Sequence, residues 1–243
     1  MRKILFLTVL SLILIMPALS QAAPAGNPAD PVLLVGTYPI KGEAIADIVF
    51  ERELDQGSEI EAQWYLAKVG VTLIEKIDVY GLLGTANLEP KKLTSSVYDI
   101  ESEYGVAWGL GAKVLLYETE EYGDGILRVS VDGNYRAYKP DIDTISGSTS
   151  SSGEVDFAEW GASLGLSYTL DKITPYVGVK YSDVDLEISG TNIGTLDTLS
   201  INSDNVVGVF VGADYLFAEN IALNLEGRFI DETAVNVGLK INF

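Results

Sequence analysis

The sequence predicts an all-β protein, an up-and-down antiparallel transmembrane β-barrel of about ten strands. Three observations lead to this fold class. The chain ends on residues 234–243, which alternate between apolar and polar up to the aromatic Phe243. The same period of two returns in segments of roughly ten residues along most of the chain. The first residues have the pattern of an export signal.

The N-terminal residues are predicted to be a secretory signal peptide. Two basic residues precede an apolar run from Ile4 to Leu19, and small residues follow it. This order predicts cleavage after about residue 22, so that residues 1–22 are the signal peptide. The alternative, a membrane-anchor helix, is disfavoured because the run is short and Pro17 interrupts it. The sequence contains no cysteine, which excludes a cysteine-linked lipid anchor, disulfides and thiolate metal sites.

Residues 23–45 fit no barrel strand and are predicted to form a periplasmic arm or partial plug, which leaves 46–243 as the barrel. The alternating segments lie at about 46–54, 65–73, 77–88, 104–116, 127–136, 160–170, 175–182, 206–217, 220–230 and 234–243. Most exceed the five or six residues of sandwich strands, and one face is continuously apolar, which favours a membrane barrel over a soluble sandwich. Both faces of 77–88 are apolar, so its register stays open. Eight strands is the alternative if the first hairpin lies outside the barrel.

The links between strands are predicted to be of two kinds. Tight turns at 75–76, 171–172 and 218–220, with a longer one at 118–125, alternate with longer links at 90–100, 140–153 and 189–204. Two further links on the long-loop side, at 55–58 and 231–232, are short. Short periplasmic turns and longer outer loops are typical of bacterial barrels, so both termini are expected in the periplasm and the chain in the outer membrane.

Together, the export signal, the alternating strands, the glycine-rich inner faces and the final Phe243 resemble the small outer-membrane barrels of the OmpA and opacity-protein type. The resemblance covers residues 46–243 and is one of architecture. It implies that the closing strand is the signal read by the barrel-assembly machinery. The residues of that signal are Val235, Val237, Leu239, Ile241 and Phe243. Ile241 departs from the second aromatic common in such signals, and we expect the protein to lack the peptidoglycan-binding domain of OmpA proteins.

Aromatic residues on the predicted lipid face are expected to form a girdle at the membrane interfaces, where amphipathic rings suit the headgroup level. They are Tyr104, Trp108, Tyr135, Trp160, Tyr168, Tyr181, Tyr215 and Phe217.

Charged residues on the opposite faces are expected to line the lumen. They are Lys68, Lys113, Arg128, Asp132, Arg136, Lys180, Asp214, Glu226, Arg228 and Lys240. In the first interpretation these charges pair and fill the barrel, because eight to ten strands leave only enough width for side chains. The second is a narrow, anion-preferring pore, because the predicted inward cations outnumber the anions. The lumen width favours the first.

Acidic residues gather in the predicted loops. They are Asp99, Glu101, Glu103, Asp141, Asp143, Glu154, Asp156, Glu159, Asp183, Asp185, Glu187, Asp197 and Asp204. In the favoured interpretation these carboxylates keep the outer strand ends solvated. In the weaker one they share divalent cations with lipopolysaccharide. The net charge of −19 argues against nucleic-acid binding.

The function predicted is a structural or surface-interaction role in the outer membrane, with a narrow solute channel as the alternative. A barrel enzyme is disfavoured because there is neither histidine nor cysteine, and no carboxylate pair has a diagnostic spacing. We therefore expect no catalytic residues, cofactor or metal site. The expected partners are outer-membrane lipid, lipopolysaccharide and the barrel-assembly machinery, and an external partner stays open.

Overall fold

The structure is a computed structural model that describes residues 40–243, apart from 75, 94–97, 120–124, 147–151, 192, 194–195 and 197–198. The predicted signal peptide, most of the predicted arm and Asp197 lie outside the described residues. Within the described part of the chain, no helix is long and apolar enough to cross a membrane.

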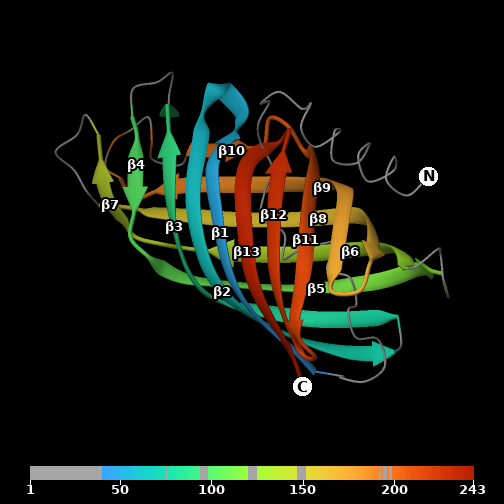
Figure 1. The fold of residues 1–243 in the computed structure, drawn as a ribbon. Helices are drawn as coiled ribbons and strands as arrows, with labels where there is room; N and C mark the ends of the chain where they lie inside the picture. Colours follow the sequence, from blue (N-terminus) through green and yellow to red (C-terminus); the bar gives the residue numbers. More distant parts are fainter. Residues whose placement is uncertain are drawn as a thin grey trace.

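Ten antiparallel strands of the described chain close into a barrel (Figure 1). They are β1 (Ile40–Glu53), β2 (Glu59–Ile74), β3 (Ile77–Lys91), β5 (Gly105–Glu118), β6 (Ile126–Tyr138), β8 (Glu154–Thr169), β9 (Ile173–Ser189), β11 (Val207–Ala218), β12 (Ile221–Phe229) and β13 (Glu232–Asn242). Each strand pairs with the next of these in sequence, and β13 pairs with β1, which closes the ring. The predicted fold class and the count of ten are confirmed.

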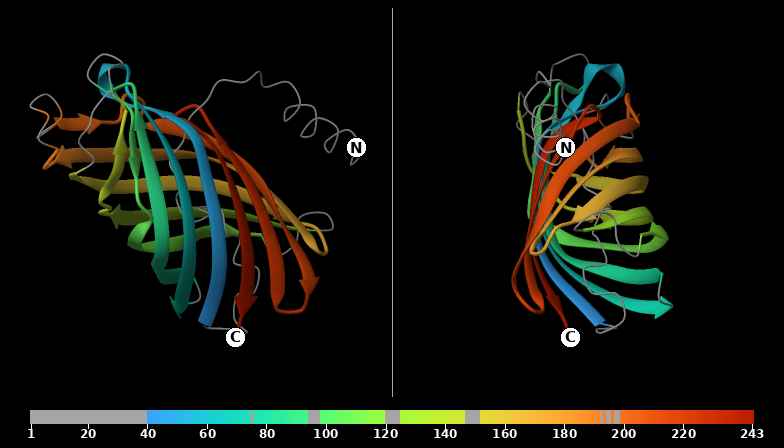
Figure 2. Two further views of the ribbon diagram at one scale, coloured as in Figure 1. Left: turned by 90° about the vertical axis from the view of Figure 1, so that its left-hand side faces the viewer. Right: turned by 45° about the vertical axis from the view of Figure 1, so that its right-hand side comes forward.

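The two ends of the barrel differ. At one end, here called the turn end, the short links gather, and the backbone N–H of Phe243 donates to the carbonyl oxygen of Ile40 at 2.9 Å. The opposite end, the loop end, carries the short 3-10 helix η1 (Asp55–Gly57) and three short strands. Figure 2 shows the C-terminus at the end away from the loops.

The three short strands at the loop end were not predicted. β4 (Ile100–Ser102) and β7 (Ile142–Ile145) pair with each other, and β10 (Leu199–Asn202) pairs with β9 outside the ring. They lie in the links that the sequence predicts as longer loops. Segments of three or four residues are too short for a period of two to be recognised in the sequence.

The predicted boundary between arm and barrel at residue 46 is wrong, because β1 begins at Ile40 and its first residues pair with both β13 and β2. Two features hide this strand in the sequence. Its inward face mixes charged and apolar side chains, as Glu43 and Ile45 show. A β-bulge between Val49 and Glu51 then shifts the alternation, so that Phe50 is exposed and Arg52 is buried.

Strands β8 and β9 are longer than predicted and project toward the loop end. Glu154, Asp156, Asp183, Asp185 and Glu187, predicted in loops, therefore lie on strands. The prediction missed these parts of the strands because the polarity of the two strand faces is reversed there. In the projecting part the apolar side chains point inward and the acidic ones outward, the opposite of the lipid-facing part. The register of β3 is also settled, with Tyr80 and Leu82 inside and Leu83 outside.

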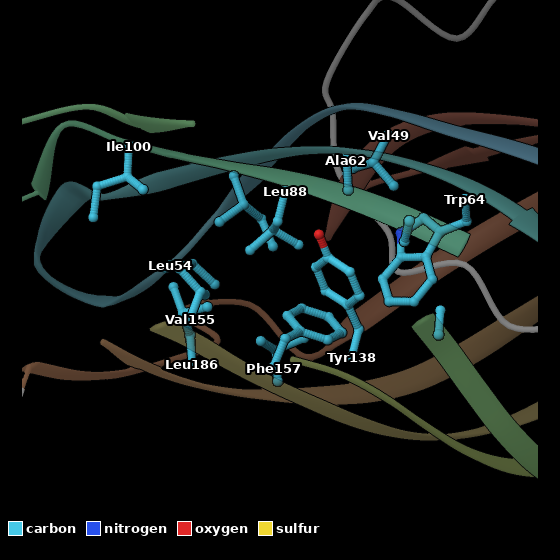
Figure 3. Packing of buried hydrophobic residues seen from close by; sticks show 14 of the residues in the cluster. Val49, Leu54, Ala62, Trp64, Leu88, Ile100, Tyr138, Val155, Phe157 and Leu186 are labelled. Atoms are coloured by element: carbon cyan, nitrogen blue, oxygen red, sulfur yellow. The ribbon is translucent and has the colours of Figure 1, made fainter. Parts of the chain in front are cut away.

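The loop end of the barrel encloses a hydrophobic core (Figure 3). Trp64 on β2 lies against Tyr138 on β6 and Phe157 on β8, with ring centroids 5.7 and 5.4 Å apart. Leu88 of β3 and Leu186 of β9 are fully buried in the same cluster. Side chains from opposite walls thus meet across the interior and fill it, as in the core of a soluble protein.

Candidate functional site: the barrel interior

Every side chain of the predicted lumen cluster lies inside the barrel. All of them are buried except Lys68, whose side chain is 11% exposed. They come from β2, β5, β6, β9, β11, β12 and β13, because the inward position recurs at every second residue of each strand.

The predicted excess of inward cations is wrong. Among the described residues the buried basic side chains are Arg52, Lys113, Arg128, Arg136, Lys180, Arg228 and Lys240. The buried acidic ones are Glu43, Asp47, Asp132, Glu159, Asp214, Glu226, Asp231 and Glu232. With Lys68, which also lies inside, eight cations therefore face eight anions. Sequence reasoning missed Glu43 and Asp47 in a strand of mixed polarity, and it assigned Glu159 to a loop and Asp231 and Glu232 to a link.

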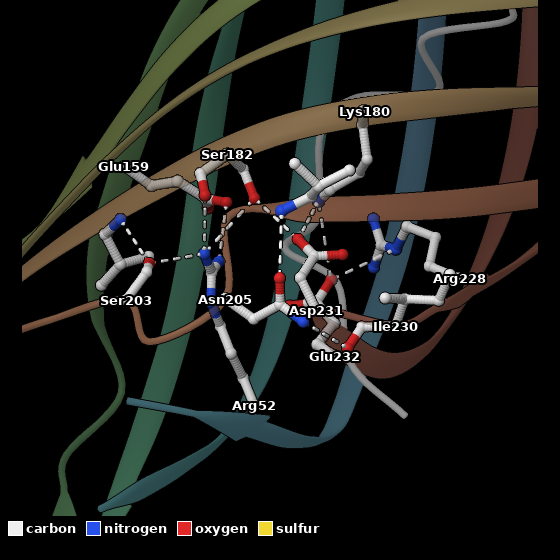
Figure 4. Close-up of polar contacts among 12 residues, drawn as sticks. Arg52, Glu159, Lys180, Ser182, Ser203, Asn205, Arg228, Ile230, Asp231 and Glu232 are labelled. Atoms are coloured by element: carbon white, nitrogen blue, oxygen red, sulfur yellow. Dashed lines mark hydrogen bonds and ion pairs between the residues drawn. The ribbon is translucent and has the colours of Figure 1, made fainter. Parts of the chain in front are cut away.

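Eight of these side chains form a connected network that we call the ion-pair belt, and Figure 4 shows the part of it around Arg52, Lys180 and Arg228. Its members are Asp47, Arg52, Arg136, Glu159, Lys180, Arg228, Asp231 and Glu232. Four are basic and four are acidic. β6, β8 and β9 supply one side of the belt and β12, β13 and β1 the other, so it crosses the lumen between opposing parts of the ring.

Glu159 is the centre of one half of the belt. Its Oε1 lies 3.0 Å from Nη1 of Arg52, and its Oε2 lies 2.6 Å from Nη2 of Arg136. Arg136 also faces Asp47, with Nη1 and Oδ2 3.8 Å apart, and Asp47 accepts a hydrogen bond from Arg228. One carboxylate thus holds two guanidinium groups in the interior.

The other half of the belt is built around Lys180 and the link between β12 and β13. Nζ of Lys180 lies 3.5 Å from Oδ2 of Asp231 and 4.0 Å from Oε1 of Glu232. Nε of Arg228 lies 3.5 Å from the same Oε1. This link begins at Ile230, a β-branched residue with φ of 91°, a conformation such residues seldom adopt.

Ser182 connects the halves, and Ser203 gives Arg52 one further partner. The hydroxyl of Ser182 donates to Oδ2 of Asp231 at 3.0 Å, while Nη2 of Arg52 donates to the Ser182 carbonyl oxygen at 3.2 Å and to Oγ of Ser203 at 2.9 Å. The chain of contacts therefore returns to its starting point. Removing one partner of such a buried pair leaves the other charge uncompensated, which is strongly destabilising.

The belt and the hydrophobic core lie one after the other along the barrel. On β6 the inward residue after Arg136 is Tyr138, and on β8 the inward residue before Glu159 is Phe157. Both steps lead toward the loop end. The guanidinium of Arg136 lies 3.9 Å from the ring centroid of Trp64, so the belt rests directly on the core.

Glycines of the inner faces make room for aromatic side chains. A Cβ on Gly178 would overlap the ring of Phe210, and one on Gly212 would overlap the ring of Tyr176. Each ring lies across a strand pair from its glycine. The glycine-rich inner faces thus let rings cross a narrow interior.

The predicted girdle residues lie on the outer surface. Three aromatic pairs form a row toward the loop end, with ring centroids 5.0 to 6.4 Å apart. The pairs are Trp160–Tyr181, Trp108–Tyr135 and Tyr65–Tyr104. Tyr65 was not in the predicted set. Tyr168, Tyr215 and Phe217 lie near the strand ends at the turn end.

Four of the predicted assembly-signal residues lie on one face of β13, and Phe243 directly follows its last residue. Val235, Val237, Leu239 and Phe243 are exposed, and Ile241 is partly exposed. Their role in assembly stays a prediction.

Most of the remaining predicted acidic residues lie on the outer surface at the loop end, whereas Glu159 belongs to the belt. Asp156 and Glu154 contact Lys139, at 3.1 and 3.4 Å. The hydrogen bond to Asp156 raises the pKa of Lys139 above its usual range. No group of three metal-ligating side chains occurs among the described residues.

A closed barrel with a lipid-type outer surface and a charged interior defines the class of outer-membrane β-barrel proteins. Within this class the chain is similar to chlamydial proteins. The family model described as Chlamydia major outer membrane protein matches residues 135–195. Outer membrane protein B of Chlamydia muridarum is 27% identical over 165 residues, which cover 60% of this chain and 47% of that protein.

The major outer membrane porin, serovar A, of Chlamydia trachomatis is 24% identical over 230 residues, covering 65% of this chain and 57% of the porin. The chain thus spans about half the length of these relatives. The transport unit of the autotransporter AIDA-I from Escherichia coli has the same fold, with a TM-score of 0.52 at 9% identity, covering 88% of this chain and 94% of that one. These similarities support the predicted location in the outer membrane, whereas the narrower OmpA and opacity type stays an expectation.

Proposed function

We propose that the protein is a closed, non-enzymatic barrel of the outer membrane with a structural or surface-interaction role. The observation that carries this proposal is the double obstruction of the interior by the ion-pair belt and the hydrophobic core. An ion entering from the turn end would have to displace paired buried charges and then cross an apolar region, and both steps cost free energy.

Conductance in planar bilayers tests this proposal. The protein is refolded in detergent, shown to be folded by its shifted mobility on unheated gels, and added to a bilayer beside a known porin as positive control. We expect no discrete current steps, and none from Arg136→Ala or Arg228→Ala. Reproducible steps from the unaltered protein would overturn the proposal.

A narrow channel is the second candidate function, because the chain is similar to a protein named as a major outer membrane porin. The balance of buried charge removes the reason for expecting an anion preference. If the protein does conduct, the belt is the expected constriction, and Arg136→Ala would change the step size.

For partners, we propose contact with lipid and lipopolysaccharide through the outer surface, and recognition of β13 by the barrel-assembly machinery. The alternation of exposed apolar residues along β13 supports the second of these. The projecting β8 and β9, with β4, β7 and β10, offer the surface on which an external partner would bind.

A further inference from the structure

We propose that the mouth of the barrel at the turn end binds a small oxyanion of the phosphate class. This goes beyond the proposed function, which requires no ligand. A cavity of about 40 Å³ lies at this mouth, and its charged lining consists of Lys41, Glu43, Lys68, Asp78, Lys113 and Lys240. Four ammonium groups thus converge from β1, β2, β5 and β13 on a space that also faces two carboxylates.

In the lining of the mouth four lysines face two carboxylates, and Asp214 and Asp132 lie behind Lys240 and Lys113. Lys240 is level with Glu43 in the cross-strand register, whereas Glu226 lies deeper, level with Asn236 and Asp47. An anion can therefore reach ammonium donors at the mouth, whereas farther in it meets Glu226 and then the paired charges of the belt. This arrangement favours a blind binding site over a passage.

The lysines can contact an anion without giving up their present ion pairs. Lys41 pairs with Asp78 at 2.5 Å, Lys68 with Glu43 at 3.3 Å, and Lys240 with Asp214 at 2.8 Å. An ammonium group has three N–H donors, so one that contacts a carboxylate can also donate to a second anion. The side chains of Lys41 and Lys68 are only 19% and 11% exposed, and partial burial strengthens such contacts.

The size of the cavity limits the ligand. A water molecule needs about 10–15 Å³ in this measure, so the cavity holds roughly three waters or one small inorganic anion in their place. Nucleotides and sugar polymers are too large.

The test is calorimetric titration of the refolded protein with inorganic phosphate, in a nonionic detergent that carries no phosphate. We expect a Kd of about 1 mM or tighter. Lys41→Gln removes one cation of the lining and should weaken binding about tenfold. Asp78→Asn removes one anion of the same lining, keeps the shape of the side chain, and should tighten binding. Lys139→Gln, at the exposed loop end, is the matched control and should change nothing.

Opposite shifts from Lys41→Gln and Asp78→Asn separate an anion site from a merely structural ion pair, since loss of structure would weaken binding in both. Gel mobility before heating shows that each variant is folded, and if Lys41→Gln does not fold, Asp78→Asn alone decides. No binding to the unaltered protein, or shifts in the same direction, would overturn the proposal. So would a response to anionic lipid vesicles without one to inorganic phosphate, because the lysines would then serve the membrane surface.

Discussion

At the scale of single residues, the charged side chains of the interior are stable only where an opposite charge lies beside them. Glu159 is 2% exposed and holds Arg52 and Arg136, whereas Asp156 on the same strand faces solvent beside Lys139. The two carboxylates are close in sequence and differ in surroundings. They therefore form a natural pair for measuring what burial does to a charge.

Glu159→Ala is expected to lower the free energy of unfolding by about 3–5 kcal/mol, because it leaves two guanidinium groups in the interior without their carboxylate. Asp156→Ala should change it by no more than about 1 kcal/mol, as for exposed ion pairs generally. Equilibrium unfolding in denaturant, from micelles or lipid, measures both. Equal losses would mean that the belt is hydrated and not a buried network.

Gly178→Ala should also destabilise the barrel, by about 1–3 kcal/mol, because the added methyl group overlaps the ring of Phe210. Gly161→Ala is the control. It also faces inward, but its added methyl group would meet nothing nearer than 3.4 Å. The same unfolding assay compares them. If both substitutions are tolerated alike, the ring of Phe210 does not cross the lumen above Gly178.

At the scale of elements, the strands combine two polarities under one alternation. Along β8 the outward residues change from Glu154 and Asp156 near the loop end to Trp160, Leu164 and Leu166 farther on. The same alternate residues point outward along the whole of β8, but the environment outside the barrel changes along the strand. The sequence therefore predicts the lipid-facing half of β8 and misses the projecting half.

Strand β13 closes the ring against β1, and its outward residues are the proposed assembly signal. Phe243→Ala should reduce the amount of folded barrel recovered from the outer membrane of cells while leaving refolding of the purified protein in detergent unchanged. Fractionation with unheated gels measures the first, and refolding yield the second. If both yields fall together, Phe243 serves stability, and if neither falls it carries no signal.

At the scale of the whole molecule, the barrel joins a membrane-type half to a half packed like a soluble protein. The belt lies where these halves meet, with Arg136 resting on Trp64. Two different obstructions therefore lie in series, one of paired charges and one of apolar side chains. Opening either alone leaves the other in place.

This arrangement predicts that conductance responds to both obstructions together. Arg228→Ala and Phe157→Ala should each be silent in planar bilayers, whereas the double variant, once shown to be folded on gels, should produce brief openings. Current steps from either single variant would show that one obstruction alone keeps the unaltered barrel shut. Silence of a folded double variant would mean that neighbouring side chains close the gap.

The sequence by itself determined the fold class, the number of strands, the lipid-facing side of most strands and ten of the inward charged side chains. It could do so because alternation along a strand is a local property that needs no knowledge of distant residues. Only the tertiary structure decided which charges pair. Arg52 meets Glu159, Lys180 meets Asp231 and Glu232, and Arg228 meets Asp47, and each of these pairs joins residues far apart in the sequence. It also decided that acidic segments predicted as loops continue as strands over a hydrophobic core. Both parts of these strands alternate between polar and apolar residues, and only the packing shows that the apolar face points outward in one part and inward in the other.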